Sequence, residues 1–121
     1  MVSQQKSNKR RGAAWEIDLE DWFITNEYDA QRLPRAGVND IGDVVLKTPN
    51  DVYVIEAKAP QRDGRIDLSG WIKEAKVEAE NYRKAKNLKI APTPLVIIKA
   101  SNKGVEEAYV VQRLSDVLAK L

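Results

Sequence analysis

Apolar residues near the start of the chain recur at helical spacing. Trp15, Leu19, Trp22 and Phe23 follow one another at i, i+4, i+7 and i+8, which predicts an amphipathic helix from Gly12 to about residue 26. On a helical wheel of ~100° per residue, Glu16 projects about 20° from Phe23, at the edge of the apolar stripe. A carboxylate at that edge can reach a site on a sheet against which the helix packs.

Short runs rich in β-branched and apolar residues predict five strands, at residues 28–33, 42–48, 52–58, 95–98 and 108–111. A second amphipathic helix over residues 69–88 is expected to bury Ile72, Ala75, Ala79 and Tyr82. Ser115 is expected to cap a final short helix that ends at Leu121. The resulting order, α-β-β-β-α-β-β-α, predicts an α/β fold in which helices flank a mixed β-sheet.

The second and third predicted strands form a hairpin around residues 48–51. If Thr48 pairs with Asp51, Asp43 pairs with Glu56 at the other end. Pro49 cannot adopt the positive φ of the usual two-residue hairpin turn, so a longer loop and a shifted register stay open.

In the first register, two carboxylates and an ammonium converge at the end of an apolar hairpin, because Lys58 shares the face of Glu56. This convergence is typical of a divalent-metal site with a neighbouring cation. The alternative is a surface salt bridge between Glu56 and Lys58, with Asp43 capping a turn. Asp40 is a second candidate for the metal ligand that Asp43 would supply.

The amino-acid composition limits which catalytic groups and metal ligands the chain can supply. The 121 residues include no cysteine and no histidine, which excludes thiolate and histidine zinc sites, thiol nucleophiles and a Ser-His-Asp triad. Carboxylates with Mg²⁺ or Mn²⁺ are the natural remaining combination. No apolar run approaches the ~20 residues that span a bilayer, so no membrane segment is predicted.

The net charge of +2 is unevenly placed. Residues 1–11 contain four basic residues and no acid, giving +4 and leaving −2 for the rest. This basic, polar arm is predicted to be flexible and suggests a partner that carries phosphates. A tail that only aids solubility is the alternative.

The ordered set of Glu16, Asp43 and Glu56-Ala57-Lys58 resembles the PD-(D/E)XK nuclease superfamily. Within it, the chain is most similar to the archaeal-type Holliday junction resolvases, including phage-encoded relatives. Arg11-Gly12 before Glu16 resembles their basic-Gly opening, and Arg32 resembles the arginine that precedes their flexible loop. The chain departs from the pattern at Gly42, in place of the motif's proline, which is often missing among members of the superfamily, and at Ile17, where the resolvases usually have arginine.

The resemblance implies a restriction-endonuclease-like fold, with one nuclease domain over residues 12–121 behind the flexible arm. It implies hydrolysis of DNA phosphodiesters at four-way junctions with Mg²⁺, or Mn²⁺ as a substitute. Asp43, Glu56, Glu16 and the Ala57 carbonyl would hold the metal, and Lys58 would assist the attacking water. DNA contacts are expected from Lys9, Arg10, Arg11, Arg32 and Arg35, with Arg62, Arg65 and Lys73 as secondary candidates.

The resemblance also implies a homodimer, since one chain has one site and a junction needs two symmetric cuts. The expected location is the cytoplasm, at the nucleoid or in the host cell of a phage. Two alternatives stay open: an endonuclease of the same superfamily acting on other branched or linear DNA, and a non-catalytic DNA-binding module of the same fold.

Overall fold

The structure is a computed structural model that describes residues 4–34, 40–61 and 64–121, with residues 4–11 described by their backbone alone. The elements are α1 (Gln4–Thr25), β1 (Asp29–Arg32), β2 (Val44–Thr48), β3 (Asp51–Lys58), α2 (Leu68–Ala85), β4 (Thr93–Ile98), η1 (Val105–Glu107), β5 (Tyr109–Val111) and α3 (Leu114–Leu118). The predicted order of helices and strands is confirmed, with the short 3₁₀ helix η1 added between β4 and β5. No helix of the described residues is both long and apolar enough to cross a bilayer.

Helix α1 begins at Gln4, so the prediction that it starts at Gly12 was wrong. Residues 4–11, which were expected to belong to a flexible arm, have a helical backbone; residues 1–3 lie outside the described part. Hydrophobic periodicity could not detect this extension because the segment carries no apolar stripe. Its glutamine, lysine and arginine residues nevertheless have good intrinsic helix propensity.

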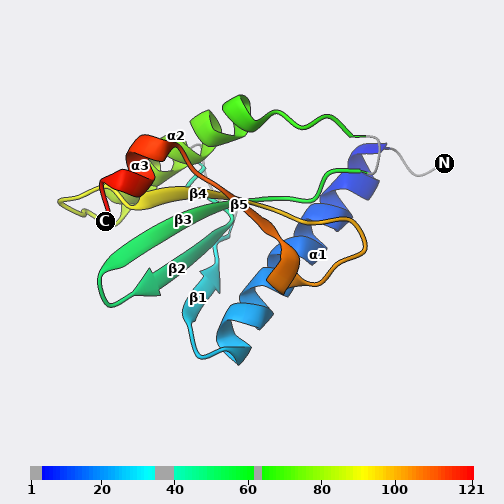
Figure 1. The fold of residues 1–121 in the computed structure, drawn as a ribbon, viewed down its shortest axis with the longest axis horizontal. Helices are drawn as coiled ribbons and strands as arrows, with labels where there is room; N and C mark the ends of the chain where they lie inside the picture. The colour runs from blue at the N-terminus through cyan, green and yellow to red at the C-terminus, as the bar shows by residue number, and fades with distance from the viewer. Residues whose placement is uncertain (1–3, 35–39, 62–63) are drawn as a thin grey trace.

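The described strands form one five-stranded sheet in the order β1-β2-β3-β4-β5 (Figure 1). Only β3 and β4 are parallel within it, and α2 is the crossover that connects them. Helix α1 packs Trp15 and Leu19 on one face of the sheet, and α2 packs Ala75, Ala79 and Tyr82 on the other. The predicted architecture, a mixed sheet flanked by helices, is confirmed.

The hairpin has the register in which Thr48 pairs with Asp51. The paired residues end at Val44 and Ile55, and the N–H of Asp43, one residue before the strand, donates to the Ile55 carbonyl at 3.1 Å. The loop contains only Pro49 and Asn50, and Asn50 is not among the described residues with positive φ. A turn with negative φ at both positions therefore accommodates the proline, and no longer loop is needed.

Candidate active site

Asp43 is fixed at the point where β2 begins. Gly42 before it has φ +104°, and a Cβ there would lie 2.6 Å from Val54 Cγ1, so glycine is required for the chain to turn so close to β3. The Asp43 side chain is only 1% exposed, and its Oδ2 accepts a hydrogen bond from the Ala57 N–H at 2.9 Å. This bond continues the β2–β3 ladder through a side chain and holds the carboxylate against β3.

Glu56 and Lys58 project from β3 toward α2, on the face opposite to α1. Glu56 is 4% exposed. Lys58 Nζ lies 3.5 Å from Glu56 Oε1 and donates to Glu74 Oε1 on α2 at 3.1 Å. Its ammonium also lies 5.5 Å from the centre of the Trp71 ring, within the range of a cation–π contact. The structure therefore confirms that Glu56 and Lys58 share one face of the hairpin.

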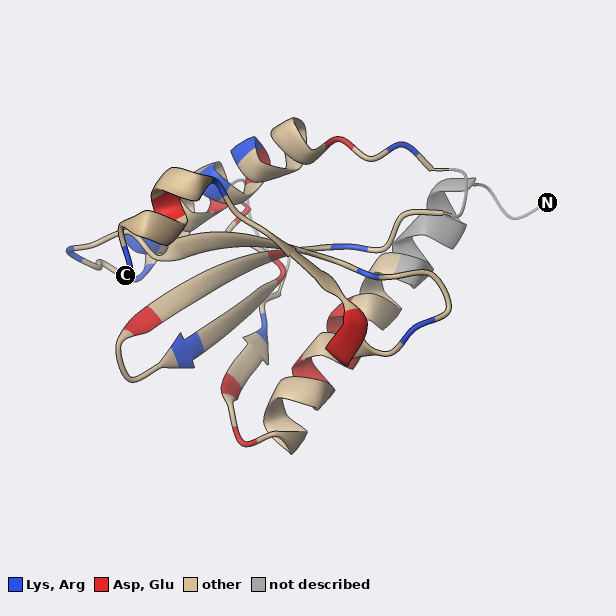
Figure 2. Ribbon diagram, in the orientation of Figure 1, with Lys and Arg blue, Asp and Glu red and all other residues tan. Residues whose placement is uncertain are grey.

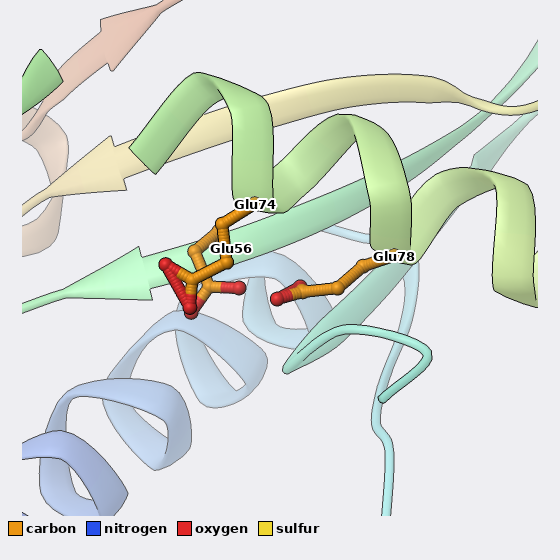
Figure 3. Close-up of side chains that lie close together, drawn as sticks. All are labelled: Glu56, Glu74 and Glu78. Carbon is orange, nitrogen blue, oxygen red and sulfur yellow. The ribbon is translucent and has the colours of Figure 1, made fainter. Parts of the chain in front are cut away.

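Two further acids reach this place from α2. Glu74 and Glu78 point from the helix toward Glu56 on β3, and one carboxylate oxygen of each of the three residues lies within 4.8 Å of the others (Figure 3). Glu78 is 2% exposed, whereas Glu74 is exposed to solvent. The cluster thus has a buried side, formed by Glu56 and Glu78, and an open side at Glu74.

The crowding of acids changes their affinity for protons. Burial raises the pKa of Glu56 to about 11, and the neighbouring Glu78 and Asp43 add to this rise. Burial also raises the pKa of Glu78 to about 7; the proximity of Glu56, with which it could share a proton, lowers it, while the charges of Asp40, Asp43 and Glu74 raise it. Both shifts have the same origin: negative charges gather where water cannot solvate them. A bound cation would relieve both.

The charge state of Lys58 suits an electrostatic role. Burial lowers the pKa of its ammonium group, but Glu56 and Glu74 more than offset this, so that the pKa is raised overall. Lys58 therefore keeps its proton at neutral pH. It can donate a hydrogen bond and supply positive charge, but it is a poor general base.

The oxygen atoms of the cluster fit a hard divalent cation. Glu56 Oε2 and both Glu78 carboxylate oxygens are buried without a hydrogen-bond partner among the described residues. Buried polar atoms normally have such partners, so these oxygens are suited to bind something else. Carboxylate and carbonyl oxygens are the donors that Mg²⁺ and Mn²⁺ prefer. In a strand, the N–H and the carbonyl of one residue point toward the same neighbouring strand. Because the Ala57 N–H donates to Asp43, the Ala57 carbonyl also faces the side of β2 and Asp43.

Glu16 and Arg32, both predicted from the sequence as site residues, are paired with each other. Glu16 is buried on α1, and its Oε1 lies 3.5 Å from Arg32 Nη2. The Arg32 N–H also donates to Glu20 Oε2 at 2.6 Å, which ties β1 to α1. The acidic cluster on the α2 face, as found among the described residues, does not include Glu16. A role of Glu16 as metal ligand therefore stays a prediction.

Asp40, the alternative to Asp43, has a different environment. It is exposed, and its Oδ1 accepts a hydrogen bond from the Gly42 N–H at 2.9 Å. Its backbone carbonyl accepts another from Asn81 Nδ2. These contacts stabilise the turn before β2, and the choice between Asp40 and Asp43 as metal ligand stays a prediction.

The residues expected to contact DNA are only partly described. Lys9, Arg10 and Arg11 lie in the backbone-only part of α1, while Arg35 and Arg62 lie outside the described residues. Charges of both signs are spread over the described helices and strands, so on this part of the chain charge alone does not mark a DNA-binding face (Figure 2). A hollow of about 380 Å³ adjoins Lys58 and is also lined by Arg65, Gln61 and Trp71. DNA contacts of all these basic residues stay predictions.

Sequence reasoning missed Glu74 and Glu78. A signal for Glu78 was present: on a wheel of ~100° per residue it lies about 60° from Ala75 and about 40° from Tyr82. Ala75 and Tyr82 were both predicted to be buried and are buried. An acid inside an apolar stripe is unusual enough to mark a candidate functional residue.

The fold and the site together define an α/β protein with a restriction-endonuclease-like mixed sheet and an acidic centre between that sheet and its crossover helix. Among solved structures, the chain is similar to Archaeoglobus fulgidus Hjc, a Holliday junction resolvase from an archaeal hyperthermophile. The TM-score is 0.53 at 15% sequence identity, covering 88% of this chain and 93% of that chain. Neither the protein-family models nor the sequences of curated proteins give a match. The likeness shows that the two proteins share a fold.

Proposed function

We propose that this protein is a metal-dependent endonuclease that hydrolyses DNA phosphodiesters, with four-way junctions as its substrate and a role in DNA recombination and repair. One observation carries the proposal: the buried carboxyl group of Asp43 is held against β3 at Ala57, the residue between the buried Glu56 and Lys58, whose side chains lie 3.5 Å apart. The fold shared with a junction resolvase supports the choice of substrate.

Each residue of the site has a distinct task in this proposal. Asp43, Glu56 and the Ala57 carbonyl would hold Mg²⁺ or Mn²⁺, and Glu16 would contribute from α1. When bound, such a cation offsets negative charge at the phosphate and makes water more acidic. Lys58 donates a hydrogen bond to the attacking water or to the phosphate oxygens as negative charge develops. Because Glu56 and Glu74 already hold its ammonium, little reorganisation is needed during the reaction.

The surroundings of Lys58 offer a place for the DNA backbone. Arg65 and Trp71 are among the residues that line the hollow beside Lys58. Arginine suits phosphate because its planar group can bind two oxygens at once. The basic residues Lys9, Arg10 and Arg11 would extend this contact, together with Arg32 and Arg35.

Two copies of the chain would act together. A four-way junction is resolved by two symmetric cuts, and each chain carries one proposed site, so a two-fold homodimer is the simplest assembly that supplies both.

Cleavage of labelled DNA tests the proposal. We expect the protein to cut a four-way junction when Mg²⁺ is added, to leave it intact in EDTA, and to cut linear duplex of the same sequence far more slowly. Glu56→Ala should abolish cutting, while Glu80→Gln, at a half-buried position of α2 where the carboxylate pairs with Arg83, should not. Equal cutting of duplex and junction would contradict the proposal that four-way junctions are the substrate. Binding without any cutting would indicate a non-catalytic DNA-binding module.

A further inference from the structure

Helix α2 places Glu78 where an apolar side chain would be expected. The residue lies between the buried Ala75 and Tyr82 and is itself only 2% exposed. Its carboxyl group faces β3 and the start of β2 (Figure 3). A Cβ added to Gly42 would lie 3.8 Å from Glu78 Oε2, so the backbone before Asp43 approaches this carboxylate closely. Glu78 therefore closes the inner side of the site, opposite the exposed Glu74.

The contacts of Glu78 leave its charge unbalanced. Neither carboxylate oxygen has a hydrogen-bond partner among the described residues, and the neighbouring acids Glu56, Glu74, Asp43 and Asp40 surround it with further acidic groups. Burying a carboxylate without donors or a counter-charge is strongly unfavourable. The nearby ammonium of Lys58 is directed to Glu56 and Glu74.

A single proton does not resolve this imbalance. Carboxylates only accept hydrogen bonds, so a proton shared by Glu56 and Glu78 would join one oxygen of each and leave the other oxygens without a partner. A divalent cation can bind oxygens of several carboxylates at once. One oxygen of Glu56, Glu74 and Glu78 already lies within 4.8 Å of the others, a separation that a common ion can bridge.

We propose that Glu78 is a ligand of a divalent cation that it shares with Glu56, with Glu74 as a third carboxylate on the open side. The cation is a hard, oxygen-binding one such as Mg²⁺ or Mn²⁺. The inference rests on the proposed function because Glu56 is a metal ligand there, and it adds helix α2 to the metal site. Glu74 is exposed and also pairs with Lys58, so its loss should weaken cation binding less than the loss of Glu78.

Calorimetric titration with Mn²⁺ at pH 8 tests the role of Glu78 without DNA. We expect Glu78→Gln to bind Mn²⁺ at least about 10- to 100-fold more weakly than wild type, since even a residue that only supports a ligand has an effect of this size. Glu80→Gln on the same helix is the matched control and should bind like wild type. Equal Mn²⁺ affinity of Glu78→Gln and wild type would overturn the inference.

A second measurement uses the unaltered protein, so that it does not depend on the folding of a variant. Anomalous diffraction from wild-type crystals grown with Mn²⁺ should place an ion within about 2.0–2.6 Å of a Glu78 oxygen. An ion bound by Asp43 and Glu56 with Glu78 beyond that range would overturn the inference.

The two proposals can fail separately. Mn²⁺ binding through Glu78 in a protein that cuts no DNA would contradict the nuclease and support the metal ligand. If metal-dependent cutting and Mn²⁺ affinity are both the same in Glu78→Gln as in wild type, the nuclease is supported and Glu78 is not a metal ligand.

Discussion

Lys58 lies between two carboxylates, with its Nζ 3.5 Å from Glu56 Oε1 and 3.1 Å from Glu74 Oε1. In the proposed reaction it is a preorganised donor whose removal leaves the metal ligands in place. We expect Lys58→Ala to lower the single-turnover rate of junction cleavage by about 10²–10³ while DNA affinity stays close to that of wild type. Lys89→Ala, in the exposed loop after α2, is the control. Equal rates for Lys58→Ala and wild type would remove Lys58 from the mechanism.

The buried acids predict how stability depends on pH. The pKa of Glu78 is raised from the ordinary 4.5 to about 7, so the folded state binds more protons than the unfolded state between these values. The corresponding stabilisation is complete below pH 4.5 and is lost as the pH rises through 7. Glu56, with its pKa raised to about 11, acts in the same direction over a wider range.

We therefore expect the Tm of the protein in EDTA to fall between pH 5 and pH 8, and to fall less in Glu78→Gln. Mg²⁺ should raise the Tm more at pH 8 than at pH 5, because it binds the deprotonated carboxylates. Thermal denaturation followed by circular dichroism measures both effects. A pH dependence that is identical in Glu78→Gln and wild type would contradict this account of the cluster.

At the scale of elements, the turn into β2 depends on Gly42. A Cβ at this position would meet Val54 Cγ1 at 2.6 Å, and φ of +104° is strained for any other residue. We expect Gly42→Ala to destabilise the protein by about 1–3 kcal/mol or more in urea denaturation. Gly12→Ala is a matched control because nothing lies within 4 Å of its Cβ position and it sits inside α1; it should stabilise the protein by about 1 kcal/mol. Equal stability of Gly42→Ala and wild type would show that the turn tolerates a side chain.

The strands could be predicted from their runs of apolar residues, and the register that pairs Thr48 with Asp51 was one of those considered. The sequence alone left a longer loop at Pro49 open, because the backbone angles of the turn are set only in the folded hairpin. The first turns of α1 could not be predicted in this way, as residues 4–11 bury no apolar stripe.

Glu78 was missed for a different reason. Periodicity identifies the apolar members of a buried helix face, and it gives no information on which strand residue an acid on that face will meet. The contact of α2 with β3 depends on the crossover between the parallel strands β3 and β4, and this tertiary arrangement places Glu78 beside Glu56.

At the scale of the whole molecule, binding to DNA should depend strongly on salt. If the basic residues near the N-terminus contact phosphates, each contact adds about 0.9 to the slope of log Kd plotted against the logarithm of the salt concentration. We expect a variant with Lys9, Arg10 and Arg11 all replaced by alanine to have a shallower salt dependence in fluorescence anisotropy titrations. A salt dependence unchanged from wild type would argue that these residues do not touch the DNA backbone.

The requirement for two cuts predicts the assembly. We expect light scattering after gel filtration to give twice the mass of one chain, in the presence or absence of Mg²⁺. A monomer both alone and on a four-way junction would contradict the homodimer.

The most direct measurement is a Mg²⁺ titration of junction nicking by wild type and Glu56→Gln, a change that keeps the shape of the side chain and removes its charge. We predict that wild type is inactive in EDTA and gains activity with Mg²⁺ in a saturable way, and that Glu56→Gln binds the junction but stays inactive at every Mg²⁺ concentration. Nicking by wild type that is independent of Mg²⁺, or a Glu56→Gln variant with the Mg²⁺ response of wild type, would contradict the claim that the carboxylates at the ends of β2 and β3 hold a catalytic cation.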